Sequence, residues 1–319
     1  MLDPEGPKPS ADVPGDPVDS EGAAPEAVDP EADAAGSPTV SPWAPGPGEV
    51  QPEIKAVAAR LVEVAGTWGE GAGGMESAAG RLSAAGFDPA LVAALSRLLD
   101  DDGERAVVDI LYPQYGGLTP AEASVMVALD QALVRGDGTS SVRGMTLDVR
   151  LAPSATGWSV VAVGPDQPAQ GPGSPTPLGE AVLANPRVVL PADARADVSS
   201  GTVLDPVLVV LDGLARDHTI EVLTFSTGHP VNVFGTDRQS NHSRGRAVDI
   251  WRVDGALVVD PATPRDLLGA VMTKAGQLGA TEVGGPFDLN GERPRYFTDD
   301  LHKDHLHIGV SEGRSPAVP

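Results

Sequence analysis

Residues 240–249 read SNHSRGRAVD and residues 302–307 read HKDHLH, and these two stretches decide how the C-terminal half of the chain is interpreted. All six histidines of the 319-residue chain lie beyond residue 217, and four of them fall in these stretches beside carboxylates. A catalytic zinc site takes three protein ligands from His, Asp, Glu or Cys and leaves one position to water. Because the chain has no cysteine, any such ligands must be nitrogen or oxygen atoms.

The spacing within each stretch is compatible with such a site. His242 and Asp249 flank Gly245, and a loop that turns at this glycine into a strand near Ala247 would bring both side chains to one point. The third ligand must then come from the second stretch. Residues two apart on a strand share a face, so His305 and His307 would point the same way. If one binds the metal, the other is placed to exchange protons with a bound water.

Both stretches resemble motifs of one metallopeptidase superfamily. The pattern S-x-H-x-x-G-x-A-x-D over residues 240–249 is similar to the first metal motif of zinc D-alanyl-D-alanine carboxypeptidases in every fixed position. His305-x-His307 is similar to the second motif of lysostaphin-type murein endopeptidases, and Asp304-x-x-His307 resembles the acidic-x-x-His signature of the carboxypeptidases. Residues 226–229, STGH, resemble a variant found in actinobacterial relatives. The resemblance covers about residues 220–312 and does not reach residues 51–163.

The resemblance implies a single zinc ion held by His242, Asp249 and His307. It leaves the catalytic acid/base open, because this residue is a Glu in many carboxypeptidases and a His in the endopeptidases. Asp304 stands where the Glu would be, and His305 is also present. We favour His305, since strand geometry puts it on the metal face, and Asp304 stays in contention if the strand begins after it.

The implied reaction is amide hydrolysis on peptidoglycan peptides. Zinc lowers the pKa of bound water to about 7, and a neighbouring base takes the proton and delivers it to the leaving amine. His229 or Arg238 would assist the oxyanion. The arginines between residues 238 and 252, among them Arg238 and Arg244, form a basic island that suits a substrate carboxylate, unless they are solvated surface residues.

A non-catalytic alternative belongs to another functional class. Hedgehog proteins have a domain of similar fold, and they are usually cited as an example of a zinc-bearing module that has lost catalytic turnover. The chain would then be a cell-wall recognition module. The presence of both Asp304 and His305 favours catalysis. The motifs do not distinguish endopeptidase from carboxypeptidase action, and His302 is expected at the surface beside Lys303.

Composition shifts divide the chain into four parts. Residues 1–50 are rich in Pro, Ala, Gly and acidic residues and predict a disordered acidic tail. Residues 51–163 predict a small α+β domain of unknown role, with helices beginning at Pro52, near Met75–Ala85 and over Pro89–Leu99. A capping-box pattern at Thr119–Glu122 predicts a further helix start, and a hairpin is expected between residues 145–151 and 158–163.

Residues 164–177 predict a Pro/Gly linker, and residues 178–319 predict a second α+β domain that folds and binds zinc without residues 1–163. This domain should be a small antiparallel sheet flanked by helices. Helices and strands occur in it without a βαβ rhythm. We expect helices over residues 192–198 and 206–216. A further helix, capped by Thr263, should run to about Leu278. Strands are expected at residues 219–225, 247–251, 256–259, 281–283 and 306–310.

Charge and segment patterns exclude several partners. The net charge of −23 argues against nucleic acid and an anionic membrane surface. No run of 18 apolar residues predicts a membrane span, and the N-terminus shows no signal peptide. An extracytoplasmic, cell-wall location follows from the resemblance alone, so the compartment stays open.

Overall fold

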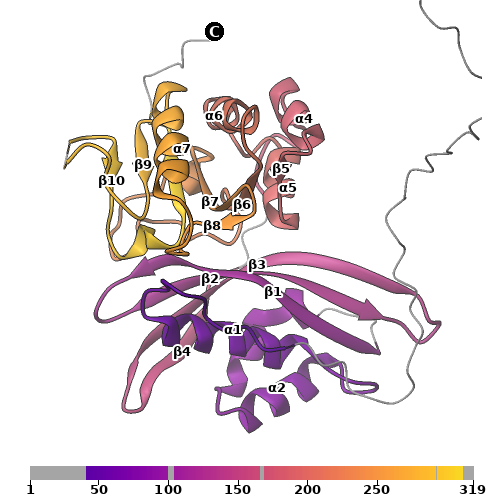
Figure 1. Ribbon diagram of the computed structural model, residues 1–319. Coiled ribbons are helices and arrows are strands. Elements are labelled where there is room, and N and C mark those ends of the chain that lie inside the picture. Colours follow the sequence, from indigo (N-terminus) through magenta and orange to yellow (C-terminus); the bar gives the residue numbers. More distant parts are fainter. Residues whose placement is uncertain (1–40, 100–103, 166–168, 292, 312–319) are drawn as a thin grey trace, which may run out of the picture. The chain divides into compact units, whose positions relative to one another are not determined.

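Two sheets organise this computed structural model, which describes residues 41–99, 104–165, 169–291 and 293–311 (Figure 1). The first sheet has the order β1-β2-β3-β4, and the second has the order β10-β9-β11-β7-β6-β5, with β8 paired to β7. Helices accompany both sheets, which confirms the α+β class. Of the predicted tail, residues 1–40 lie outside the described residues, and residues 41–50 lie within them.

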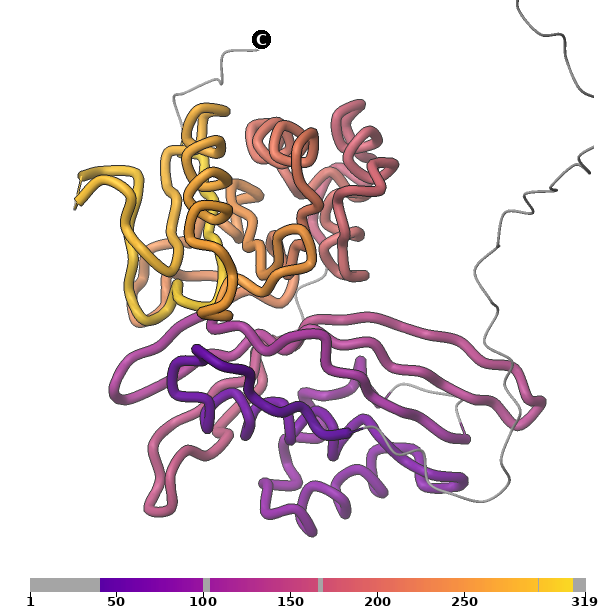
Figure 2. The backbone as a smooth tube through the Cα atoms, viewed as in Figure 1, coloured from indigo at the N-terminus to yellow at the C-terminus, as the bar shows by residue number. Residues whose placement is uncertain are grey.

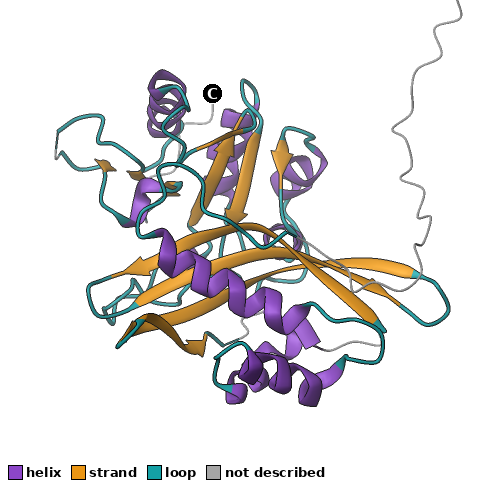
Figure 3. Ribbon diagram, turned by 60° about the horizontal axis from the view of Figure 1, so that its bottom comes forward, coloured by secondary structure: helices purple, strands orange, loops and turns teal. Residues whose placement is uncertain are grey.

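The helices at the start of the described chain follow the sequence prediction. They are α1 (Pro52–Gly66), α2 (Gly74–Ala84), the 3-10 helix η1 (Pro89–Leu95) and α3 (Ser96–Leu99). Pro52 opens α1, where its missing N–H leaves no bond unmade. At the other end of α1, the Arg81 guanidinium donates to the carbonyls of Val64 and Ala65, at 3.0 and 2.7 Å. Figure 3 shows α1 lying across the first sheet.

The first sheet is an antiparallel meander of β1 (Arg105–Leu118), β2 (Ala123–Val134), β3 (Ser140–Ser154) and β4 (Gly157–Val163). The predicted hairpin between β3 and β4 is confirmed, with Ser154 paired to Gly157. The predicted helix start at Thr119 is wrong. The Thr119 hydroxyl oxygen accepts hydrogen bonds from the N–H groups of Ala121 and Glu122, at 3.3 and 3.1 Å, within the tight turn between β1 and β2. The same local bonds that cap a helix therefore close a hairpin here.

The sequence pattern does not predict β1 and β2, because their central residues are buried on both faces. Val125, Val127 and Leu129 belong to the core shared with the helices. The alternate residues Met126 and Ala128 pack, together with Tyr112, against Leu223 and Trp251 of the second sheet and against Val259 in the turn after β8. A strand covered on both faces is a continuous apolar run, without the alternation that marks a half-exposed strand.

The second sheet is mixed rather than antiparallel, which corrects the prediction. The central strands β6 (Ile220–Thr224), β7 (Ala247–Val253), β11 (Leu306–Gly309) and β9 (Glu282–Gly284) pair antiparallel. The short outer strands β5 (Val188–Val189) and β10 (Tyr296–Phe297) pair parallel to β6 and β9. Strand β8 (Ala256–Leu257) forms a hairpin with β7. Two-residue outer strands reached through loops can take either direction.

Four helices cover this sheet: α4 (Pro177–Ala184), α5 (Ala192–Ser199), α6 (Asp205–Ala215) and α7 (Arg265–Gln277). Thr263 does not cap α7, because its hydroxyl donates to the Leu257 carbonyl at 2.6 Å and the N-cap position is Pro264. The 3-10 turns η2 (His242–Arg244) and η3 (Leu301–Lys303) precede β7 and β11. Figure 2 traces the backbone from the indigo segment at the start of the described chain to the yellow segment near its end. Among the helices of the described segments, none has the length and apolarity needed to span a bilayer.

Residues 41–50, which composition assigns to the tail, make specific contacts. The Trp43 N–H donates to Glu63 at 2.6 Å, and the carbonyls of Val50 and Gln51 accept the Tyr115 hydroxyl at 3.0 and 2.9 Å. These bonds tie the segment that precedes α1 to α1 itself and to the strand β1.

Candidate metal centre

The pairing of β7 with β11 brings two of the expected ligands together. Asp249 lies directly opposite His307 in this antiparallel ladder. His242 reaches the same point from η2, which ends at Gly245 in the left-handed conformation (φ 67°). A Cβ at Gly245 would lie 2.0 Å from the Thr202 carbonyl oxygen, so the tight turn requires glycine.

Three ligand atoms converge in this arrangement. Asp249 Oδ1 is 3.1 Å from His242 Nε2 and 3.0 Å from His307 Nδ1, and the two histidine nitrogens are 3.1 Å apart. Tetrahedral zinc with bonds of about 2.0–2.1 Å separates its ligand atoms by roughly 3.3 Å. Two imidazoles and one carboxylate at these separations fit zinc in both donor type and spacing.

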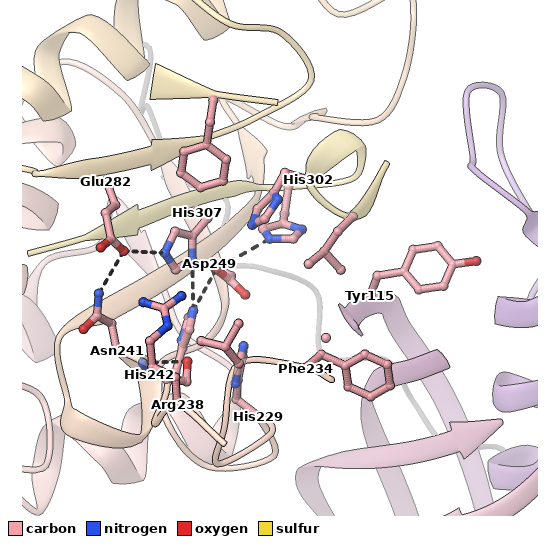
Figure 4. Close-up of a pocket in the computed structure, with 16 residues that line it drawn as sticks. Tyr115, His229, Phe234, Arg238, Asn241, His242, Asp249, Glu282, His302 and His307 are labelled. Carbon is pink, nitrogen blue, oxygen red and sulfur yellow. Dashed lines mark hydrogen bonds and ion pairs between the residues drawn. The ribbon is translucent and has the colours of Figure 1, made fainter. Parts of the chain in front are cut away.

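Each ligand has a partner that sets its orientation. His242 Nδ1 lies 2.5 Å from the Phe225 carbonyl, which directs Nε2 toward the other ligands. Gln114 Nε2 of β1 donates to Asp249 Oδ2 at 2.7 Å, and His307 Nε2 is 3.8 Å from Glu282 Oε2. Outer partners of this kind fix the tautomer and ring orientation of metal-binding residues. Figure 4 shows Glu282, His307 and His242 turned toward one another.

The charges of the site reinforce this geometry. Burial by itself raises the pKa of Asp249, but the neighbouring His242 and His305 outweigh it and hold that pKa well below its usual range. Burial lowers the pKa of His307, whereas its bonds with Asp249 and Glu282 raise it, and together they give a pKa of about 9. Asp249 and Glu282 therefore favour positive charge at this point.

The structure separates the two acid/base candidates. His305 Nε2 lies 3.7 Å from Asp249 Oδ1 and the ring lines the cavity beside the ligands. Asp304 lies behind this ring, 1% exposed, with Oδ1 2.6 Å from His305 Nδ1. Asp304 is absent from the cavity wall. Asp304 therefore orients His305, and His305 faces the expected metal ligands.

A cavity of about 190 Å³ opens onto these residues (Figure 4). Arg238 lines it, whereas Arg244 does not and instead donates to Gln239 Oε1 at 3.3 Å from an exposed position. His229 also lines it and stacks on His242, with ring centroids 3.9 Å apart. Much of the remaining wall is aromatic or apolar. Tyr115 and Gly116 come from β1, and the other such residues are Val233, Phe234, Phe297 and Leu301.

His229 offers a second possible ligand set with His242 and Asp249, whose candidate atoms lie within 4.8 Å of one another. The set containing His307 is tighter, with all three separations at 3.0–3.1 Å, and it matches zinc more closely. Burial lowers the pKa of His229 well below its usual range, and the neighbouring His242 lowers it further. His229 is therefore a neutral wall residue. Its Nδ1 donates to the Pro230 carbonyl at 2.8 Å, so its Nε2 can accept a hydrogen bond but not donate one.

The sequence motifs do not identify several residues that lie near the centre. Gln114 lies in an apolar strand, and Glu282 follows a short loop. His302, expected at the surface, has a side chain only 12% exposed and lines the cavity. Lys55 had a readable signal, because it shares the buried face of α1 with Ala58 and Val62 at helical spacing.

Comparison with known proteins returns no matching family model, no matching curated protein and no matching solved structure.

Proposed function

We propose that this chain is a zinc-dependent peptidase that hydrolyses amide bonds in peptidoglycan peptides. The observation that carries the proposal is the triangle of His242, Asp249 and His307 ligand atoms with His305 Nε2 beside it. The peptide substrate class rests on the resemblance of residues 240–249 and 304–307 to cell-wall metallopeptidases. The sequence and the arrangement of the side chains thus support the same class of reaction by separate routes.

The residues around the centre would divide the work of amide hydrolysis. When bound, zinc would lower the pKa of a water molecule to about 7 and polarise the scissile carbonyl. His305 Nε2 would accept the proton of the attacking water and deliver it to the leaving amine, while Asp304 holds Nδ1. Arg238 would bind a substrate carboxylate at the cavity wall.

The cavity suits a short substrate segment. Its volume of about 190 Å³ is small beside the roughly 300–1,000 Å³ of most ligand pockets. Only the groups that flank the cleaved bond would be enclosed, and the aromatic side chains of Tyr115, Phe234 and Phe297 would exclude water from them.

Metal analysis and peptidoglycan digestion by the purified full chain test this function. We expect one zinc per chain and new amino groups released from muropeptides. His242→Ala should lose zinc, whereas His305→Ala should keep it and lose about 10²–10⁴-fold in turnover. Arg238→Ala should raise KM, with Arg244→Ala as the matched control outside the cavity. Full zinc occupancy in His242→Ala would overturn the ligand assignment.

The products distinguish the remaining possibilities. Release of free D-alanine indicates carboxypeptidase action, and cleavage of cross-linked dimers indicates endopeptidase action. If the wild-type protein binds zinc and peptidoglycan but releases no amino groups, the chain is a recognition module and the peptidase proposal fails.

A further inference from the structure

Lys55 is a buried cation close to the candidate centre, although it comes from α1, far from the metal motifs in sequence. Its side chain is 0% exposed, and Nζ lies 2.7 Å from Asp304 Oδ2. Its other polar neighbours are the Glu49 carboxylate and the Tyr112 hydroxyl, the latter at 3.2 Å. The ammonium also lies over the rings of Tyr112 and Tyr115.

Both oxygens of the Asp304 carboxylate face hydrogen-bond donors. Oδ1 faces His305 Nδ1 at 2.6 Å, and Oδ2 accepts from Lys55 and from the Tyr115 N–H, the latter at 3.1 Å. Two of these three donors belong to α1 and β1. The orientation of Asp304, and through it of the His305 ring, is therefore set by residues outside the motif-bearing segment.

A packing role does not explain a lysine at this position. The neighbouring buried positions of α1, Ile54, Ala58 and Leu61, are apolar. Burying the Lys55 ammonium together with its two carboxylate partners is costly in desolvation. Apolar residues of similar volume commonly replace buried ion pairs without loss of stability. The charge is therefore better explained by what it does to Asp304 than by the stability of the helix.

We propose that Lys55 is a positioning residue that holds Asp304, and so directs His305 Nε2 toward the metal ligands. This inference rests on the proposed peptidase function. It assigns to residues 41–163 a part in the site: α1 and β1 complete the acid/base arrangement from behind.

The test compares variants that remove the cation with a matched lysine variant. Lys55→Met leaves Glu49 and Asp304 without their cation, so the double variant Glu49→Gln with Lys55→Met is included to remove the extra negative charge. Lys274→Met is the control. Lys274 lies on α7, and its ammonium forms a long, exposed ion pair of 3.9 Å with Asp217. Zinc content, thermal unfolding, kcat and KM are measured for each on the full chain.

We expect the double variant to fold and keep its zinc, with kcat reduced about 10–100-fold and KM within about threefold of wild type. In an Asp304→Asn background, the same change should have little further effect, because both residues act through one contact. A folded double variant with wild-type kcat, or effects that multiply in the Asp304→Asn background, would overturn the inference. If the methionine variants do not fold, Glu49→Gln with Lys55→Gln serves the same comparison.

A second readout keeps this inference separate from the proposed function. The short bond between His305 Nδ1 and Asp304 should give a downfield proton resonance in protein with ¹⁵N-labelled histidine. The resonance is assigned by its loss in His305→Asn. It should shift or disappear in the double variant and stay in Lys274→Met, whether or not the protein hydrolyses peptides. An unchanged resonance in the double variant would contradict the role of Lys55.

Discussion

At the scale of single residues, Asp249 is where most interactions of the candidate centre meet. Oδ1 lies within 3.1 Å of His242 Nε2 and His307 Nδ1, while Oδ2 accepts a hydrogen bond from Gln114. A carboxylate ligand with one oxygen on the metal gains a fixed orientation when its other oxygen is bonded. Through this bond, we expect Gln114 of β1 to strengthen zinc binding at the proposed site.

Replacing Gln114 with Ala should weaken zinc binding by about 10–100-fold while the ligands stay in place. The Asp249 carboxylate would then rotate more freely and keep one buried oxygen without a donor. Competition with a chelator of known affinity measures the effect. Gln239→Ala is the matched control, because Gln239 is exposed and contacts Arg244. Equal zinc affinity in wild type and Gln114→Ala would show that Gln114 does not contribute to metal binding.

Zinc binding should depend on pH through His307. Its pKa in the metal-free site is raised to about 9, so the ring carries a proton at neutral pH that must leave when zinc binds. The apparent zinc affinity should therefore rise by about tenfold per pH unit between pH 7 and about 9, and then level off. Glu282→Gln removes one cause of the raised pKa and should move the plateau to lower pH. A flat profile between pH 7 and 9 would show that His307 holds no proton in the free protein.

At the scale of elements, the centre depends on the turn from η2 into β7. Gly245 ends η2 with φ 67°, and the neighbouring Thr202 carbonyl leaves no room for a Cβ. The turn sets the separation of His242 from Asp249, and the β7–β11 register then aligns Asp249 with His307. A change in this turn should alter stability and metal binding together.

Gly245→Ala should lower the free energy of unfolding and abolish tight zinc binding. The left-handed conformation alone costs about 1–2 kcal/mol for alanine, and the clash with Thr202 adds to it. Gly255→Ala is the matched control: its φ is 78°, and no atom lies within 4 Å of the added Cβ. Urea unfolding should show a clearly larger loss for Gly245→Ala, with zinc retained only in the control. Equal losses would mean that the chain near Thr202 adjusts to the added methyl.

At the scale of the whole molecule, the first sheet takes part in the site as well as in packing. Tyr112, Met126 and Ala128 bury one of its faces against the second sheet, and Gln114 and Tyr115 bond to Asp249 and Asp304. The linker composition predicts that residues 178–319 fold and bind zinc alone, and this stays a prediction. The contacts indicate that such a fragment would lack Gln114 beside Asp249, and Lys55 and Tyr115 beside Asp304.

Met126→Ala tests whether the two sheets are coupled. Met126 is 0% exposed between them, so its truncation should cost about 2–5 kcal/mol. Met75→Ala is the control, because Met75 is 50% exposed and should change stability by no more than about 0.5 kcal/mol. We expect the zinc-loaded protein to unfold in one transition at a lower temperature in Met126→Ala. Two transitions, with the zinc-releasing one unmoved, would indicate independent domains.

Much of this architecture could be predicted from local sequence signals. Pro52 and the apolar spacing after it predict α1, and the β3–β4 hairpin follows from two β-rich runs around a turn. The stretches 240–249 and 304–307 predict which side chains converge. These signals suffice because helix periodicity, turn residues and short-range ligand spacing are encoded within a few residues.

Only the tertiary structure decided the rest. Thr119 makes the bonds of a helix cap but closes a hairpin, because the strands on either side pair with each other. The roles of Lys55 and Gln114 depend on contacts to Asp304 and Asp249, which lie 249 and 135 positions away in the chain. Helical spacing places Lys55 on the buried face of α1. No local pattern tells which distant side chain a buried lysine or glutamine meets, because that depends on how the elements pack.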